Sequence, residues 1–164
     1  MLFDASNLQT DRLHLAPLLP EAAEELHAIT DNPLITDAIS FLSTPFSLDD
    51  AQALIRDHFN DRDRFYGIRA LQNMQLVGVI GAHLHDPIDL EIGYWVGIDF
   101  QRRGYAFEAA NAFVTYLTQL CPHCRIIAEC RPDNTFSWRV LERIGFRSTG
   151  DAGERPGRQR LPLR

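Results

Sequence analysis

Residues 97–106 have the sequence GIDFQRRGYA and join a strand-like run, 90–96, to a long amphipathic run, 104–120. The amphipathic run carries apolar side chains at helical spacing, so a helix is expected to begin at Gly104. The first turn of a helix exposes free N–H groups and the positive end of the helix dipole, and glycine allows a ligand to approach closely. With Arg102 and Arg103 beside it, this turn is either a binding site for the phosphates of a small ligand or a solvated loop before a helix, and its spacing alone does not decide between them.

The pattern on either side of this turn alternates between strand and helix signals. Strands are expected at 8–15, 65–71, 76–84, 90–96, 125–130, from Phe146 onward and at 160–163, and helices at 20–31, 47–59, 104–120 and 134–144. Residues 34–46 mix apolar and turn residues and are interpreted as an irregular loop on the substrate side. This order predicts an α+β fold with one mixed sheet of about seven strands and about four helices. The length of 164 residues predicts a single domain, 1–164.

Charge and hydropathy narrow the class of protein. Residues 1–100 hold 16 acidic and 5 basic side chains, whereas residues 101–164 hold 6 acidic and 11 basic ones. The second part is therefore the better anion binder, but its positive excess is too small and too scattered for nucleic acid. No run approaches the roughly 20 apolar residues of a membrane span, and the start lacks the pattern of a signal peptide. We expect a cytoplasmic protein that binds neither nucleic acid nor membrane.

The three cysteines, Cys121, Cys124 and Cys130, include a Cys-Pro-His-Cys run that could form a redox pair or part of a metal site. A structural zinc site needs a full tetrahedral set of ligands, and His123 with the cysteines would have to converge from a helix end and a strand. We therefore expect small apolar thiols in a reducing compartment, and no metal. The two histidines within 83–85 share a strand face without a third ligand, so both are expected at the surface.

Several sequence blocks together resemble a known family. Residues 101–106, QRRGYA, resemble the Gln/Arg-x-x-Gly-x-Gly/Ala signature of GNAT N-acetyltransferases, and Glu108-Ala109 extends it as in the RimJ/RimL-like branch, the ribosomal-protein N-terminal acetyltransferases. Residues 134–146, NTFSWRVLERIGF, and residues 91–96, EIGYWV, resemble further blocks of that branch. With 10–13, TDRL, near the start, the resemblance covers nearly the whole chain in the family's order.

The resemblance implies the GNAT fold and an N-acetyltransferase that uses acetyl-CoA as cosubstrate and no metal. The cofactor-binding residues that it implies are Val96, Gly97, Ile98, Gln101, Arg102, Arg103, Gly104, Tyr105, Ala106 and Asn134. Backbone groups of Val96 and Ile98 are expected to contact the pantetheine arm, and residues 101–106 the pyrophosphate. Asn134 is expected to contact the cofactor arm, although its side chain could equally be a plain helix cap.

Two residues are the catalytic candidates that follow from the resemblance. Ser137 is expected near the thioester sulfur, where it donates a proton to the departing thiolate, since no aromatic hydroxyl has an obvious equivalent place. The attacking amine must be neutral although an α-amino group has a pKa near ~8, so Glu91 is the candidate base, acting through water. Glu91 could instead face solvent or pair with an arginine. A backbone N–H near Val96 or Gly97 would stabilise the tetrahedral oxyanion.

The predicted reaction is direct attack of a primary amine on acetyl-CoA in a ternary complex, with no covalent enzyme intermediate. The acceptor is a protein N-terminus or a small amine, and the acidic first part of the chain favours a cationic one. Phe41, Tyr66 and Trp95 either line its pocket or belong to the core. A monomer or homodimer is expected. The alternative is a catalytically weak acyl-CoA-binding regulatory protein of the same fold, because 160–164, RLPLR, is less apolar than the family's last strand.

Overall fold

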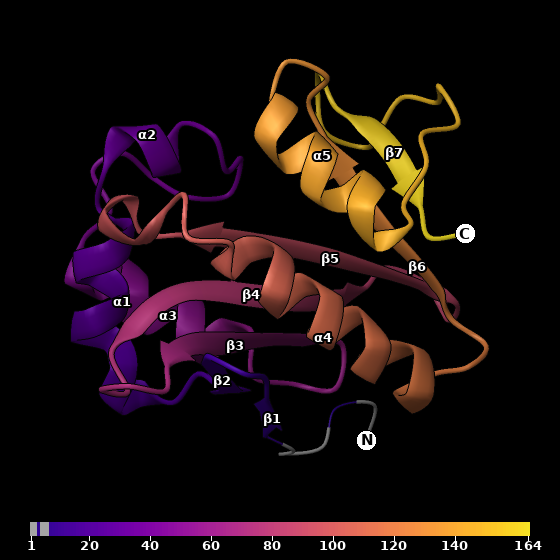
Figure 1. Ribbon diagram of the computed structural model, residues 1–164. Helices are drawn as coiled ribbons and strands as arrows, with labels where there is room; N and C mark the ends of the chain where they lie inside the picture. The colour runs from indigo at the N-terminus through magenta and orange to yellow at the C-terminus, as the bar shows by residue number, and fades with distance from the viewer. Residues whose placement is uncertain (1–2, 4–6) are drawn as a thin grey trace.

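The computed structural model describes Phe3 and residues 7–164, and the described strands form one seven-stranded sheet (Figure 1). The strands lie side by side in the order in which they occur in the sequence. Neighbouring strands are antiparallel, except for β5 and β6, which are parallel. The strands are β1 (Leu8–Gln9), β2 (Leu13–Pro17), β3 (Asp63–Ala70), β4 (Leu76–Leu84), β5 (Asp89–Val96), β6 (Arg125–Cys130) and β7 (Gln159–Pro162). The predicted α+β fold around one mixed sheet is confirmed.

Five α-helices and two short 3-10 helices connect the strands in the described part of the chain. They are η1 (Pro20–Ala22), α1 (Ala23–Thr30), α2 (Pro33–Thr36), α3 (Leu48–Asp57), η2 (Ile98–Phe100), α4 (Tyr105–Leu120) and α5 (Thr135–Ile144). Helix α4 covers one face of the sheet, whereas α1 and α3 lie against the other (Figure 1). No helix among these is long and apolar enough to cross a membrane.

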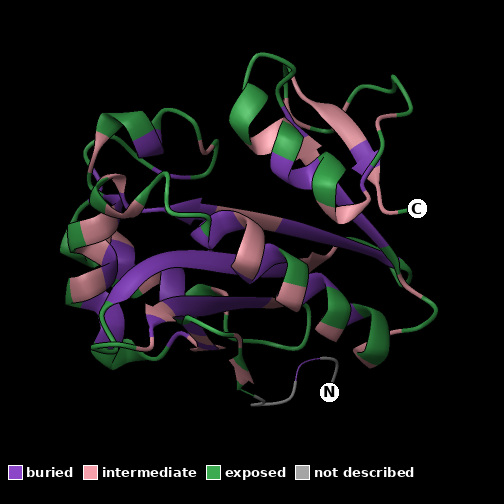
Figure 2. Ribbon diagram, in the orientation of Figure 1, coloured by how far each residue is buried: buried purple, intermediate pink, exposed green. Residues whose placement is uncertain are grey.

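The sheet supports two apolar cores, because successive side chains of a strand point to opposite faces. Under α4, the fully buried Phe113 and Leu117 pack on the central strands and on the side of α5 that carries Leu141. On the other face, Leu26 of α1 and Ala51 of α3 are fully buried. Figure 2 shows buried residues through the central strands and on the inner sides of these helices. Burial of each such leucine or phenylalanine side chain contributes roughly 1.5–3 kcal/mol to the stability of the fold.

The first predicted strand is wrong in extent, because residues 8–15 form a hairpin rather than one strand. Leu8 pairs with Leu15 across a short turn, and the Thr10 hydroxyl accepts from the Leu13 N–H over 3.0 Å to close it. No glycine or proline marks this turn, so the sequence pattern did not reveal it. The hairpin carries residues 10–12 to the side of α4.

The starts of the two N-terminal helices follow their sequence signals. Pro20 occupies the first turn of η1, and Ser47 begins α3 with a capping box in which Ser47 and Asp50 exchange side-chain and main-chain hydrogen bonds. The predicted loop 34–46 is partly wrong, because α2, which begins at Pro33, extends into it as far as Thr36. There Asn32 caps the helix by accepting from the Leu34 N–H over 3.0 Å.

The C-terminal part differs from the prediction at one element. Gly145 ends α5 as expected, with a φ of 127° that favours glycine. Phe146 does not begin a strand and makes only a single bridge to Leu163, while its ring is fully buried under α5. The apolar Phe146 is therefore a core residue, and β7 alone completes the sheet beside β6.

Candidate active site

Strands β5 and β6 are paired over only part of their length. Their register runs from Asp89 opposite Arg125 to Ile92 opposite Ala128, and beyond this β5 pairs only with β4 and β6 only with β7. A cavity of about 630 Å³ lies where the two strands diverge. It is lined by both strands, the starts of α4 and α5, the loop after α2 and the loop before β7.

The main chain of β5 turns polar groups toward this gap. Gly97 N–H donates to the Val77 carbonyl over 2.9 Å, and hydrogen-bonded and non-hydrogen-bonded pairs alternate along an antiparallel ladder. Val96 therefore points its main-chain groups away from β4. Its carbonyl accepts from Gln101 Nε2 over 3.0 Å, and its N–H faces the gap between β5 and β6. Gly97 and Ile98 do not line the cavity, since Gly97 is bonded to β4 and Ile98 lies in η2.

The predicted phosphate loop is a tight turn ahead of α4. Gly104 is the N-cap, with a φ of 80° that glycine adopts without steric cost, and Arg102 also has a positive φ of 63°. Arg102 is exposed and lines the cavity. The Arg103 guanidinium donates instead to the Asp99 carbonyl over 3.0 Å, so Arg102 is the one of these two neighbours that faces the cavity. The free N–H groups of the first turn follow, and Ala106 there also lines the cavity.

Arg12 braces this loop from behind. Its Nη1 donates to the Arg103 carbonyl over 2.9 Å, its Nε donates to Glu108 over 3.0 Å, and its guanidinium lies 4.8 Å from the centre of the Tyr105 ring. The Thr10 hydroxyl donates to the other oxygen of Glu108 over 2.8 Å. In a planar trans peptide the carbonyl and the next N–H point in opposite directions. Holding the Arg103 carbonyl toward Arg12 therefore aims the next N–H at the other side of the loop.

Ser137 faces a second hydroxyl group. Asn134 Oδ1 accepts from the Ser137 N–H over 3.3 Å, so this oxygen caps α5, and the Ser137 hydroxyl oxygen lies 3.0 Å from that of Tyr94. Burial raises the pKa of Tyr94, so the phenol stays protonated and can donate. The expectation that no aromatic hydroxyl accompanies Ser137 is therefore wrong, because Tyr94 on β5 reaches α5. Tyr94 lies within residues 91–96, one of the sequence blocks that carry the family resemblance.

Glu91 is buried, with a side chain that is 6% exposed. Its Oε1 pairs with Arg155 Nη2, and its Oε2 lies 2.5 Å from His85 Nε2. Arg155 Nε also donates to Glu129 over 3.0 Å, so one guanidinium joins two buried carboxylates. Of the alternatives for Glu91, the structure contains the arginine pair. His85 is exposed as expected and connects the Glu91 carboxylate to solvent.

The face of β5 toward α1 and α2 forms the opposite wall of the cavity. Phe41 and Trp95 line it, with ring centroids 6.0 Å apart. A Cβ placed on Gly93 would meet no atom within 4 Å, so this glycine leaves open space beside Trp95. Tyr66 belongs to the core instead, where its ring centroid is 5.0 Å from that of Phe113.

His83 also lines this wall, although the sequence predicted a surface position. Its side chain is 18% exposed, its Nδ1 lies 3.0 Å from an Asp63 carboxylate oxygen, and burial lowers its pKa. A neutral imidazole whose Nδ1–H donates to a carboxylate keeps Nε2 as an acceptor. This Nε2 lies 3.0 Å from the Cβ position of Gly81, which is opposite Gly93 in the ladder. His83 thus presents an acceptor beside the open space above Gly93.

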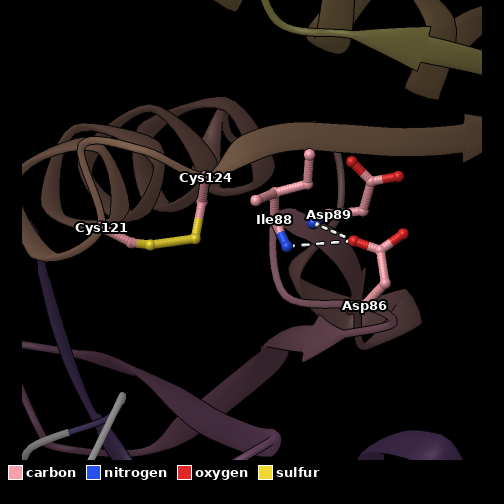
Figure 3. Close-up of a disulfide and its surroundings, with 5 residues drawn as sticks. All are labelled: Asp86, Ile88, Asp89, Cys121 and Cys124. Atoms are coloured by element: carbon pink, nitrogen blue, oxygen red, sulfur yellow. Dashed lines mark hydrogen bonds between the residues drawn. A yellow bond between two sulfur atoms is a disulfide. The ribbon is translucent and has the colours of Figure 1, made fainter.

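Cys121 and Cys124 form a disulfide, so the expectation of free thiols is wrong for this pair (Figure 3). The disulfide lies between α4 and β6, near the β4–β5 turn, where Asp86 accepts from two main-chain N–H groups over 3.0 Å each. This is the end of β6 away from the cavity. Cys130 is free and buried, as expected. No three His, Cys, Asp or Glu side chains within the described ranges are grouped to hold a metal ion.

Comparison with known proteins relates this arrangement to acetyltransferases. A family model described as an acetyltransferase (GNAT) domain matches residues 12–147. The chain is 32% identical to the uncharacterized N-acetyltransferase YnaD of Bacillus subtilis over 111 residues, which are 64% of this chain and 62% of YnaD. It therefore spans less than two thirds of the length of YnaD. It is 30% identical to YoaA of the same organism over 149 residues, 87% of this chain and 84% of YoaA.

Solved structures share the fold over almost the whole chain. A GNAT-family acetyltransferase from Bacillus anthracis has a TM-score of 0.84 at 25% identity, covering 96% of this chain and 98% of that one. RimL, a ribosomal L7/L12 alpha-N-protein acetyltransferase in complex with coenzyme A, has a TM-score of 0.85 at 18% identity, covering 97% of each. MccE, a microcin C7 self immunity acetyltransferase in complex with acetyl-CoA and AMP, has a TM-score of 0.79 at 20% identity, covering 93% and 92%. The chain belongs to the GNAT acetyltransferase family, with ribosomal-protein acetyltransferases among its relatives.

Proposed function

We propose that this chain transfers the acetyl group of acetyl-CoA to a primary amine by direct attack in a ternary complex. The observation that carries the proposal is the hydroxyl pair of Ser137 and Tyr94, 3.0 Å apart, on the wall of a cavity between diverging strands. The acceptor is a protein N-terminus or a small molecule. The cytoplasmic location and the monomeric or homodimeric state stay predictions from the sequence.

The cofactor is proposed to lie along the cavity from α4 to the hydroxyl pair. Support comes from RimL and MccE, whose solved structures hold coenzyme A and acetyl-CoA. The pyrophosphate accepts from the N–H groups of Gly104, Tyr105 and Ala106, with Arg102 adding charge and Gln101 and Arg103 holding the turn. The pantetheine arm runs past the Val96 N–H, and Asn134 contributes its side-chain amide.

Ser137 is proposed as the acid. As the carbon–sulfur bond breaks, the Ser137 O–H donates its proton to the thiolate sulfur, and the Tyr94 O–H donates to Ser137 in turn. The raised pKa of Tyr94 favours this direction, because the buried phenol is protonated before the step. Solvent returns the proton to the pair after coenzyme A leaves. The tetrahedral oxyanion is stabilised by the Val96 N–H, since the Gly97 N–H is bonded to Val77.

Glu91 is proposed as the base that takes the proton of the amine through water. Its carboxylate is opposite His83 in the ladder, and His83 Nε2 lies beside the open space above Gly93. A water in that space is proposed to take the proton of the amine and pass it to Glu91. The exposed His85, 2.5 Å from Glu91, then passes it to solvent.

A second candidate is an acyl-CoA-binding regulatory protein with little turnover. The enclosure of both Glu91 oxygens by Arg155 and His85 favours it, because a carboxylate already paired on both sides is a weaker base. Such a protein would bind the cofactor at the same proposed site, but it would not transfer the acetyl group to an acceptor.

The test is release of the coenzyme A thiol from acetyl-CoA in the presence of amines. The panel contains N-terminal peptides, amino acids, polyamines and aminoglycosides, and the variants are Ser137→Ala, Tyr94→Phe and Glu91→Gln. If the chain transfers acetyl groups, one class of acceptor should release the coenzyme A thiol. Ser137→Ala should then lower kcat by roughly a hundredfold or more and retain the affinity for acetyl-CoA. Tight acetyl-CoA binding with no release from any acceptor would favour the regulatory protein.

A further inference from the structure

Arg158 stands in the cavity without a carboxylate partner. It lies in the loop before β7, and its Nη2 donates to the Ala38 carbonyl over 2.7 Å. Within the part of the chain that the structure describes, no Asp or Glu forms an ion pair with it. Its neighbour Arg155 differs, because Arg155 is matched by two buried carboxylates. Arg158 therefore brings to the cavity a positive charge that no ion pair neutralises directly and that Glu129, which is paired with Arg155, offsets only from a distance.

The positive charge of Arg158 is energetically unfavourable in its surroundings. Burial is the main cause that lowers its pKa, the nearby charge of Arg131 adds to it, and Cys130 and Glu129 act in the opposite direction. Arg131 also lines the cavity. A guanidinium has several N–H donors in a planar fork that fits a carboxylate or a phosphate, and the Ala38 carbonyl uses one of them. An anion between Arg131 and Arg158 would match their charge and occupy the remaining donors.

Arg158 is also close to the reacting centre. Burial raises the pKa of the Cys130 thiol, and both Ser137 and Arg158 act against this rise, so both side chains lie near the thiol. Cys130 is thus a neighbour of both Arg158 and the proposed acid. The phosphate loop with Arg102 lies at the start of α4, whereas Arg158 bridges to the loop after α2. Arg158 therefore belongs to the acceptor side of the cavity.

The same contact limits the size of the acceptor. Arg158 joins the loop before β7 to Ala38, and Phe41 lines the wall nearby, so two loops enclose this side. The cavity of about 630 Å³ must also hold the end of the cofactor. Cavities of roughly 300–1,000 Å³ accommodate one small molecule. The enclosure favours a small acceptor over a folded protein.

We propose that the acceptor is a small primary amine that also carries a carboxylate or a phosphate, which Arg158 and Arg131 bind while the amine lies above Gly93. This inference rests on the proposed acetyl transfer and narrows its substrate class. It also revises the expectation of a purely cationic acceptor, because the charge imbalance of the whole chain is not the charge of this cavity. The acetyl step is unchanged, since the anionic group takes no part in bond making.

Matched acceptor pairs test the inference by the thiol-release assay. Amino acids are each compared with their carboxamides, and phosphoethanolamine is compared with ethanolamine, beside the N-terminal peptides. The anionic member of a pair should have a kcat/KM roughly ten- to a hundredfold higher, as expected for hydrogen bonds to a charged group. The two pairs distinguish a carboxylate from a phosphate. Equal turnover within every pair, or turnover of peptides alone, would overturn the inference but leave acetyl transfer standing.

Variants separate ligand binding from loop closure. Arg158→Gln should raise the KM for the anionic acceptor by roughly tenfold or more and leave the neutral partner and acetyl-CoA affinity unchanged, while Arg158→Lys should retain part of the preference. Arg56→Gln is the matched control, because Arg56 on α3 is 71% exposed and pairs with its neighbour Asp57. An equal rise in KM for anionic and neutral acceptors would mean that Arg158 only holds the loop against Ala38. If no amine releases coenzyme A, acetyl transfer itself fails.

Discussion

Replacing Arg12 by alanine should weaken acetyl-CoA binding although Arg12 lies outside the cavity. The Arg12 guanidinium orients the peptide after Arg103, and its loss frees that peptide to rotate. Hydrogen bonds to charged groups contribute about 1.5–3 kcal/mol, and the 48% exposure of Arg12 favours the lower value. Since about 1.4 kcal/mol is a tenfold change, the Kd for acetyl-CoA should rise roughly tenfold. The kcat at saturating acetyl-CoA should stay within about twofold, because no reacting group moves.

Isothermal titration calorimetry with acetyl-CoA measures this Kd directly. Arg12→Lys should lie between the wild type and Arg12→Ala, because one ammonium group cannot reproduce the fork that spans Glu108 and the Arg103 carbonyl. Arg56→Ala, an exposed arginine on α3, is the control for loss of a positive charge. An unchanged Kd in Arg12→Ala, or an equal rise in the control, would refute the bracing of the loop.

Three further predictions concern stability. Gly104→Ala should lower the free energy of unfolding by about 1–2 kcal/mol, seen as a lower Tm, because φ is 80° and the new Cβ would lie 3.3 Å from a guanidinium nitrogen. Reduction of the Cys121–Cys124 disulfide should cost at most about 2 kcal/mol, since it closes a very short loop, and should leave turnover unchanged. Although burial opposes it, hydrogen bonds from two arginines hold the pKa of Asp89 below its usual value. Stability from Asp89 is therefore present above about pH 4 and lost as the pH falls below it, which urea unfolding at several pH values measures.

A comparison variant or a contradicting outcome tests each of these predictions. A Cys121→Ser/Cys124→Ser double variant should match the reduced protein in Tm, and any loss of turnover on reduction would contradict the separation of the disulfide from the cavity. Asp89→Asn should be less stable at pH 7 and less sensitive to acid than the wild type. A Gly104→Ala variant with an unchanged Tm would contradict the strain argument.

The elements that the sequence predicted well are those with one strongly apolar face. The helix from Gly104 and the strands 76–84 and 125–130 carry enough periodic apolar residues to mark their limits. Residues 8–15 were misinterpreted because apolar alternation does not show where a hydrogen bond reverses the chain, and Phe146 because a buried apolar residue need not belong to a strand. A single Thr10 side chain divides the first strand.

The candidate site was predictable where its residues are neighbours along the chain. The phosphate loop and the start of α5 are local motifs, and they lie on the cavity as expected for Gln101, Arg102 and Asn134. Tyr94, His83 and Arg155 come from register and from a distant loop, so spacing along the chain could not bring them together. Arg12 stood in a block of the family resemblance without a role, and its contact with Glu108 becomes visible only when β1 and β2 fold onto α4.

The divergence of β5 and β6 also has a mechanical consequence. Only four paired positions connect β6 and β7 to the other five strands, so the sheet has a seam. A cofactor that is hydrogen-bonded to β5 on one side and to α5 on the other would hold the two parts of the sheet together. Ligand at a hundred times its Kd stabilises a protein by about 2.7 kcal/mol, which slows hydrogen exchange and proteolysis at the opened seam about a hundredfold. We therefore expect acetyl-CoA to protect the protein from proteolysis in proportion to the occupancy of the proposed site.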